Sequence, residues 1–95
     1  MIGPDGSIAV LAALESQIAA NPRDGIAWHN LGVELRKLDR MIEAKRAFEQ
    51  AVGLNLRSPE TETMRGHVLA DLGHFEDAIR AYRRAIDMRP TIIEA

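Results

Sequence analysis

The sequence repeats itself at an offset of 34 residues, and this period constrains the fold more than any other feature. Seven residues of the first copy recur unchanged in the second: Gly32, Leu35, Leu38, Ala44, Arg46, Ala47 and Ala51. Similar residues occupy further positions of the same register, among them Phe48 and Tyr82. Such a period indicates one supersecondary unit used twice, in which each copy buries its apolar face mainly against its neighbours.

Each copy has the pattern of two amphipathic helices joined by a turn. The apolar residues of the first helix recur at intervals of three and four: Trp28, Leu31, Leu35 and Leu38. Asp24 is expected to cap this helix, and Asp39 stands where the second copy has Gly73, a turn position near the left-handed region. A second helix should run over about 41–54, and its counterpart over about 75–88.

Small residues are placed where the two helices of a copy should cross. Gly32 and Ala44 would allow the backbones to approach, because larger side chains would hold them apart. Trp28, Leu35 and Phe48 are expected to fill the space around this crossing. We therefore interpret Trp28 as a core residue and not as a stacking platform for a ligand.

These residues resemble the tetratricopeptide repeat, a 34-residue helix-turn-helix unit with the pattern W-x-x-L-G-x-x-Y, then A-x-x-x-F, then P. The first copy carries it as Trp28, Leu31, Gly32, Leu35, Ala44, Phe48 and Ala51. The second copy carries it as Gly66, Leu69, Gly73, Ala78, Tyr82, Ala85 and Pro90. Glu62 and Arg65 replace the usual Trp and Leu there, so the first helix of the second copy should pack less apolar volume.

The resemblance implies an all-α fold, an antiparallel helix-pair solenoid with a right-handed superhelix and about two and a half repeats. A single domain is expected over 1–95. Its parts would be the second helix of a partial repeat at 7–22, complete repeats at 25–58 and 59–92, and the start of a further helix at 93–95.

Composition and motifs exclude several classes of function. A formal net charge of −2 gives no global attraction to nucleic acid or to an anionic membrane, and no apolar run approaches the length of a membrane span. The arginines of the last helix are interpreted as a solvated face with ion pairs. The chain has no cysteine and no catalytic motif, so we expect neither an enzyme nor a cofactor. A cytoplasmic protein is expected, with the periplasm left open.

Two of the histidines are candidate metal ligands. His67 with Glu60 or Asp71, and His29 from the neighbouring repeat as a third ligand, would be the candidate set. His67 and Asp71 are four residues apart, however, and a surface interaction between them accounts for the pair. No metal site is therefore predicted.

In arrays of this family, the first helices line a concave groove that holds an extended or helical peptide. The groove positions should lie about 200° round the helix from the apolar stripe. They are Ile26, His29, Asn30, Val33, Arg36 and Lys37 in the first repeat, and Glu60, Thr63, Met64, His67, Ala70 and Asp71 in the second. One set includes basic residues and the other acidic ones, which predicts a protein or peptide ligand of mixed charge. A merely solvated helix face is the alternative.

The residues of the carboxylate clamp, with which family members bind the C-terminal acid of chaperone tails, are not present at the equivalent positions. The clamp would need Lys and Asn where this chain has His29 and Val33, and Asn where it has Met64. Asn30 matches a groove asparagine used elsewhere in the family.

Two functions remain open from the sequence. The first is a protein- or peptide-binding scaffold. The second is a regulatory, substrate-docking or oligomerisation segment cut from a larger enzyme, for example a sulfotransferase or glycosyltransferase. Apolar residues at the two ends of the array lack a neighbouring helix, which predicts a homodimer through one end, unless a terminal segment folds over it. They are expected to be some of Ile8, Leu11, Leu14 and Ile18 at one end, and Ile86 and Met88 at the other.

Overall fold

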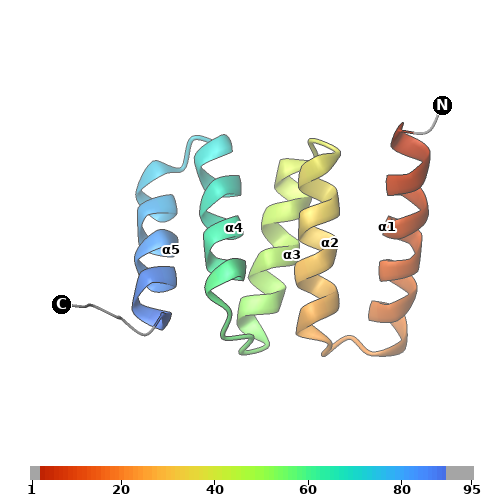
Figure 1. The fold of residues 1–95 in the computed structure, drawn as a ribbon, viewed down its shortest axis with the longest axis horizontal. Coiled ribbons are helices and arrows are strands. Elements are labelled where there is room, and N and C mark those ends of the chain that lie inside the picture. The colour runs from red at the N-terminus through yellow and green to blue at the C-terminus, as the bar shows by residue number, and fades with distance from the viewer. Residues whose placement is uncertain (1–2, 90–95) are drawn as a thin grey trace.

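The computed structural model of the chain describes residues 3–89, which form five helices and no strand. The helices are α1 (Gly3–Ala20), α2 (Gly25–Lys37), α3 (Met41–Gly53), α4 (Pro59–Asp71) and α5 (Phe75–Met88). They lie side by side in chain order, as the expected all-α helix-pair solenoid requires (Figure 1). Pro90 and the further helix expected at 93–95 lie outside the described residues.

Two of the helix starts are fixed by side-chain caps. The Asp24 carboxylate accepts a hydrogen bond from the Ala27 N–H at 3.0 Å, which confirms the cap predicted for α2. The Ser58 hydroxyl accepts from the Thr61 N–H at 3.2 Å and caps α4, immediately before Pro59 in the first turn. The N-terminal boundaries of α2 and α4, the first helices of the two repeats, are therefore set by a capping residue that is visible in the sequence.

The turns between helices use positive φ angles. Asp39, between α2 and α3, has a φ of 62°, and Gly73, between α4 and α5, has a φ of 82°. Both agree with the turn predicted from the repeat register. Asn55 after α3 has a φ of 65°, a conformation that asparagine tolerates better than most residues.

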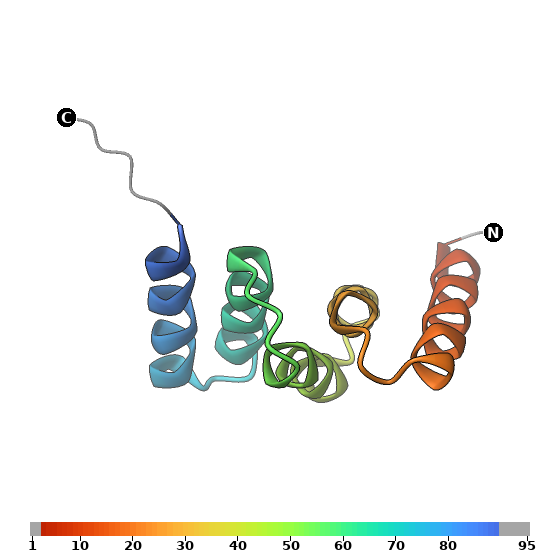
Figure 2. The same ribbon diagram turned by 90° about the horizontal axis from the view of Figure 1, so that it is seen from below.

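The core runs along the stack of helices. The helix α2 packs against α1, α3 and α4, whereas α5 packs against α4 alone (Figures 1 and 2). A larger core cluster unites the first four helices and contains Leu11, Leu14, Leu31, Leu35, Ala44, Ala47, Phe48 and Val68. A smaller cluster between α4 and α5 contains Leu69, Ala78 and Ala81. The second repeat thus has much less apolar core of its own.

The glycine of each repeat lies under the aromatic ring of the same repeat. A Cβ on Gly32 would come within 2.7 Å of the Phe48 ring, and a Cβ on Gly66 within 2.6 Å of the Tyr82 ring. We expected Gly32 to make room for Ala44, but the three atoms nearest to such a Cβ all belong to Phe48. The glycine is required because a ring, and not a second backbone, occupies the space above it.

Trp28 packs at the edge of the larger core cluster, as its place on the apolar stripe predicted. It is partly buried, and its indole N–H donates a hydrogen bond to the Pro22 carbonyl oxygen at 2.9 Å. This bond ties the loop after α1 to α2 and satisfies the polar atom of the ring.

The second repeat replaces the equivalent tryptophan and leucine with an ion pair. Glu62 is only 1% exposed, and Arg65 donates from Nη1 to Glu62 Oε1 at 3.0 Å. The reduced apolar volume expected for α4 is thus accompanied by a buried carboxylate, which the sequence pattern did not predict. The Nε of Arg65 is buried without a hydrogen-bond partner among residues 3–89.

Candidate functional site: the joined face of the first helices

Two polar contacts join α2 and α4, the first helices of the two repeats. Arg36 Nε lies 3.4 Å from Asp71 Oδ2, and His29 Nδ1 lies 2.9 Å from Thr61 Oγ1. The Arg36 contact is partly exposed and is poorly aligned as a hydrogen bond, so it contributes little stability. It brings a side chain of one repeat against a side chain of the next, whereas the relation of α2 to α4 is set mainly by the packing of both helices on α3.

His29 connects the core to the candidate groove. Its ring stands edge-on to Phe48, with centroids 5.6 Å apart and planes at 64°. Burial lowers the pKa of His29 below its usual 6.5, and the nearby Glu60 carboxylate opposes this only in part. The imidazole is therefore neutral near pH 7 and can share one hydrogen bond with the Thr61 hydroxyl. This is the environment of a positioned packing residue, not of an exposed ligand contact.

His67 is similarly engaged within its own repeat. Its Nδ1 lies 2.7 Å from the Tyr82 hydroxyl, and the two rings meet edge-on at 5.5 Å. The hydrogen bond ties α4 to α5 next to the tyrosine that covers Gly66. His67 is thus placed by an aromatic partner, which the sequence analysis had not paired with it.

The twelve predicted groove residues divide by exposure. Exposed residues are Ile26, Asn30, Lys37, Glu60 and Asp71. Partly buried residues are His29, Val33, Arg36, Thr63, Met64, His67 and Ala70. Val33 and Met64 pack against the larger core cluster. The face that a ligand could touch freely is consequently narrower than the sequence register implied.

Charges on this face pair with one another inside the chain. Arg36 pairs with Asp71, and Lys37 Nζ lies 3.3 Å from Glu34 Oε2. Hydrogen bonds from the backbone and from Ser58 lower the pKa of Glu60, which keeps that carboxylate ionised. The opposite charges that predicted a mixed-charge ligand are therefore engaged partly with each other, and the mixed-charge ligand stays a prediction.

Sequence reasoning missed Thr61, Ser58 and Glu34 as residues that shape this face. Ser58 could have been found, because a serine followed by Pro59 and Glu60 is a helix-start signal. The contact between Thr61 and His29 had no local signal, since the residues are separated by a whole repeat.

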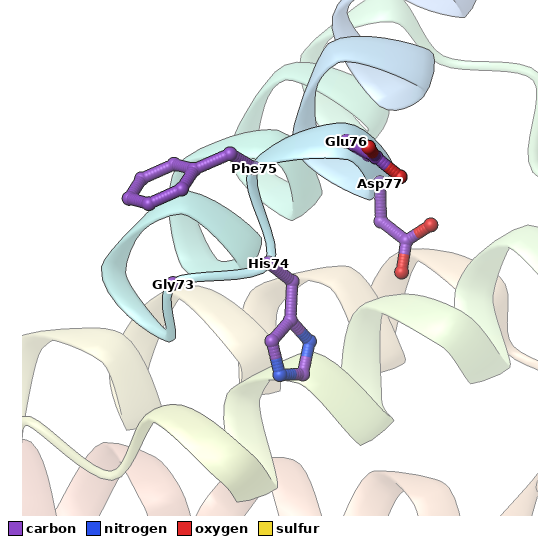
Figure 3. Close-up of a pocket in the computed structure, with 5 residues that line it drawn as sticks. All are labelled: Gly73, His74, Phe75, Glu76 and Asp77. Carbon is purple, nitrogen blue, oxygen red and sulfur yellow. The ribbon is translucent and has the colours of Figure 1, made fainter.

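The α4–α5 turn forms an open depression lined by Gly73, His74, Phe75, Glu76 and Asp77 (Figure 3). The Phe75 ring projects to one side of the turn, whereas the Glu76 and Asp77 carboxylates lie on the other. All five residues are exposed. The depression lacks the enclosure that a small-molecule site needs.

No helix in the described part of the chain is both long and apolar enough to cross a membrane.

Family models identify the repeat from the sequence, and solved structures share its fold. Models of the tetratricopeptide repeat match residues 26–57 and 59–92, which together make up most of the chain. No curated protein matches the sequence.

Three solved structures are similar to this fold. A crystal structure of MamA has a TM-score of 0.83 at 20% identity, over 88% of this chain and 49% of that one. The structure described as MamA MSR-1 C2 has a TM-score of 0.79 at 24% identity, over 87% and 48%. MamA RS-1 ArsTM double mutant has a TM-score of 0.83 at 19% identity, over 87% and 47%. This chain thus spans about half the length of those chains. Because the two sequence models cover both observed helix pairs, the chain belongs to the tetratricopeptide repeat family.

Proposed function

We propose that the chain is a protein- or peptide-binding scaffold without catalysis of its own, and that its ligand lies across the face formed by α2 and α4. The repeat family and the helix-pair fold support a protein-interaction scaffold. The observation that carries the finer proposal is the pair of contacts between α2 and α4. These contacts and the packing of both helices on α3 set the relation of α2 to α4, so a ligand would meet a preorganised surface.

Three exposed side chains of α2 suggest the chemistry of the ligand. Ile26, Asn30 and Lys37 present an apolar group, an amide and an ammonium along one face. The Asn30 amide can both donate to and accept from a peptide backbone. Ile26 and Lys37 are about 16 Å apart along the helix axis, from a rise of 1.5 Å per residue. A short peptide with an apolar side chain and an acidic group at that separation would fit.

The test begins with peptides selected on the immobilised chain from a random displayed library. Binding of the selected peptides is then measured by calorimetry for the wild type and for the double variant Asn30→Ala/Lys37→Glu. We expect affinity to fall at least roughly tenfold, because a backbone hydrogen bond and a charge contact are lost together.

The matched control is Arg46→Glu, a charge reversal of an exposed residue on the second helix α3. It should leave affinity unchanged, and circular dichroism should show the same helix content in all variants. Peptides whose binding survives the double variant but is lost in Arg46→Glu would place the site on the other face and refute the proposal.

A further inference from the structure

The outer face of α5 carries a continuous stripe of apolar side chains. Phe75, Ile79 and Ile86 are 65%, 49% and 68% exposed. Tyr82 lies between them along the helix and is partly buried, because its ring also covers Gly66 of α4 and its hydroxyl contacts His67. Their intervals of four, three and four residues are those of the a and d positions of a coiled-coil heptad. Ala78, Ala81 and Ala85 face α4 instead and are buried.

The stripe of α5 can be compared with the equivalent positions of α3 in the first repeat. The equivalent residues of α3 are Met41, Lys45, Phe48 and Val52, and all four are buried or partly buried. Phe48 belongs to the larger core cluster, which includes Val68 of α4, and Met41 packs against that cluster. Within residues 3–89, no helix takes the corresponding place on α5, since α5 packs only against α4 (Figure 2). The apolar residues of the stripe therefore occupy positions that are more buried in the repeat that has a neighbour on both sides.

The stripe is complementary to itself in the antiparallel direction. When two copies of α5 run antiparallel with a and d positions in common layers, Phe75 faces Ile86 of the second copy, and Ile79 faces Tyr82 of the second copy. All four stripe residues then find an apolar partner, and a two-fold axis passes between Arg80 and Ala81. Every layer contains one aromatic and one aliphatic side chain, so no layer is crowded by two rings.

The flanking charges select the same direction. Glu76 and Arg83 are exposed e positions beside the stripe. In an antiparallel pair the e positions of the two helices meet, and this register brings Glu76 opposite Arg83 of the second copy, twice by symmetry. In a parallel pair they would face the buried alanines of the g positions, and neither charge would gain a partner. The flanking charges thus favour the antiparallel orientation of two α5 helices over the parallel one.

From this register and charge pattern we propose that the α5 stripe is a self-association surface, on which a second copy of this chain binds through an antiparallel, two-fold α5–α5 contact. This surface is separate from the α2–α4 face, which lies on the first helices.

The α5–α5 contact is one helix long and therefore smaller than a standard protein interface. We expect a weak, reversible dimer with a dissociation constant on the order of 100 µM.

A charge exchange tests the pairing directly by sedimentation equilibrium. Glu76→Arg alone should weaken the dimer roughly tenfold or more, because each copy then places two arginines opposite two arginines. Arg83→Glu alone should do the same through its glutamates. An equimolar mixture of the two variants should form a heterodimer, since every facing pair is again opposite in charge. A mixture that stays monomeric while the wild type dimerises would overturn the proposal.

Apolar variants identify the surface. Ile79→Glu should give a monomer, whereas Ile42→Glu on α3 is a matched control for an exposed isoleucine. The second repeat already carries Glu76 at the position equivalent to Ile42, so a glutamate there is compatible with the helix. Loss of the dimer in Ile8→Glu but not in Ile79→Glu would assign it to α1 and refute the α5 contact. A wild type that is monomeric at millimolar concentration, or that dimerises only after removal of residues 90–95, would refute it as well.

Discussion

Replacement of the two equivalent glycines by alanine provides a sensitive test of the packing described above. Gly32 and Gly66 both lie inside helices, where alanine is intrinsically favoured by about 1 kcal/mol. The added Cβ would approach the Phe48 ring to 2.7 Å in one case and the Tyr82 ring to 2.6 Å in the other. Local geometry alone therefore predicts the same steric conflict at both sites.

The surroundings of the two rings differ. Phe48 is 0% exposed and belongs to the larger core cluster, so its ring has nowhere to move. Overpacking of this kind costs about 1–3 kcal/mol. After the gain in helix propensity, Gly32→Ala should lower the free energy of unfolding by about 1–2 kcal/mol. Tyr82 is partly buried, and its ring can swing outward at the cost of its hydrogen bond to His67, so Gly66→Ala should lower the free energy of unfolding by less than about 1 kcal/mol.

Urea unfolding followed by far-ultraviolet circular dichroism measures both values, at a protein concentration low enough to avoid self-association. The double variant Gly32→Ala/Phe48→Leu gives the coupling, and its loss should be smaller than the sum of the two single losses. A Gly32→Ala protein as stable as the wild type would refute the ring-over-glycine reasoning. So would a larger loss in Gly66→Ala than in Gly32→Ala, because the freedom of the ring would then be irrelevant.

Two further predictions concern ionisable groups. Glu62→Ala should lower the free energy of unfolding by about 3 kcal/mol in the same urea assay, because it leaves the partly buried Arg65 without its carboxylate. The double variant Glu62→Trp/Arg65→Leu should be neutral or stabilising. A Glu62→Ala protein as stable as the wild type would contradict the role of the pair. The pKa of His29 is lowered in the folded chain from 6.5, so the unfolded chain binds more protons just below that value. The free energy of unfolding should be constant above about pH 7 and should decrease as the pH drops below 6.5 toward the lower folded-state pKa. If the free energy of unfolding of His29→Gln decreases by the same amount, another group is responsible for the decrease.

The parts of the fold that depend on local physics could be predicted from the sequence. Asp24 caps α2 because a carboxylate before a helix accepts from the orphaned N–H groups of the first turn. The left-handed conformation of Asp39 could be predicted because the repeat register aligns this residue with Gly73, and both have positive φ angles. The all-α fold followed from the repeat period, since two helices of this length can bury their stripes only by packing together.

The shape of the candidate groove could be predicted only in outline. Helix periodicity places Val33 and Met64 opposite the apolar stripe, yet both pack against the larger core cluster, to which the first four helices contribute. The contact between α2 and α4 pairs Arg36 with Asp71, which register alone assigned to separate charged patches. Periodicity describes one isolated helix, whereas the exposure of these residues depends on the distance and angle between helices.

Glu62 and Arg65 show how a local expectation and a tertiary one can differ in the same helix. A glutamate in the first turn of a helix is usually exposed, but the repeat register places Glu62 at a core position. The structure follows the register, because Glu62 is buried. The i, i+3 spacing lets Arg65 neutralise it within α4, so the helix keeps its place in the stack while losing apolar area. A buried ion pair replaces that area without a comparable gain in stability. The second repeat therefore relies on its small cluster with α5, the helix whose stripe is open within residues 3–89. A second copy bound along that stripe would bury further apolar area on the repeat that has the least, so folding of this end and self-association are expected to be coupled.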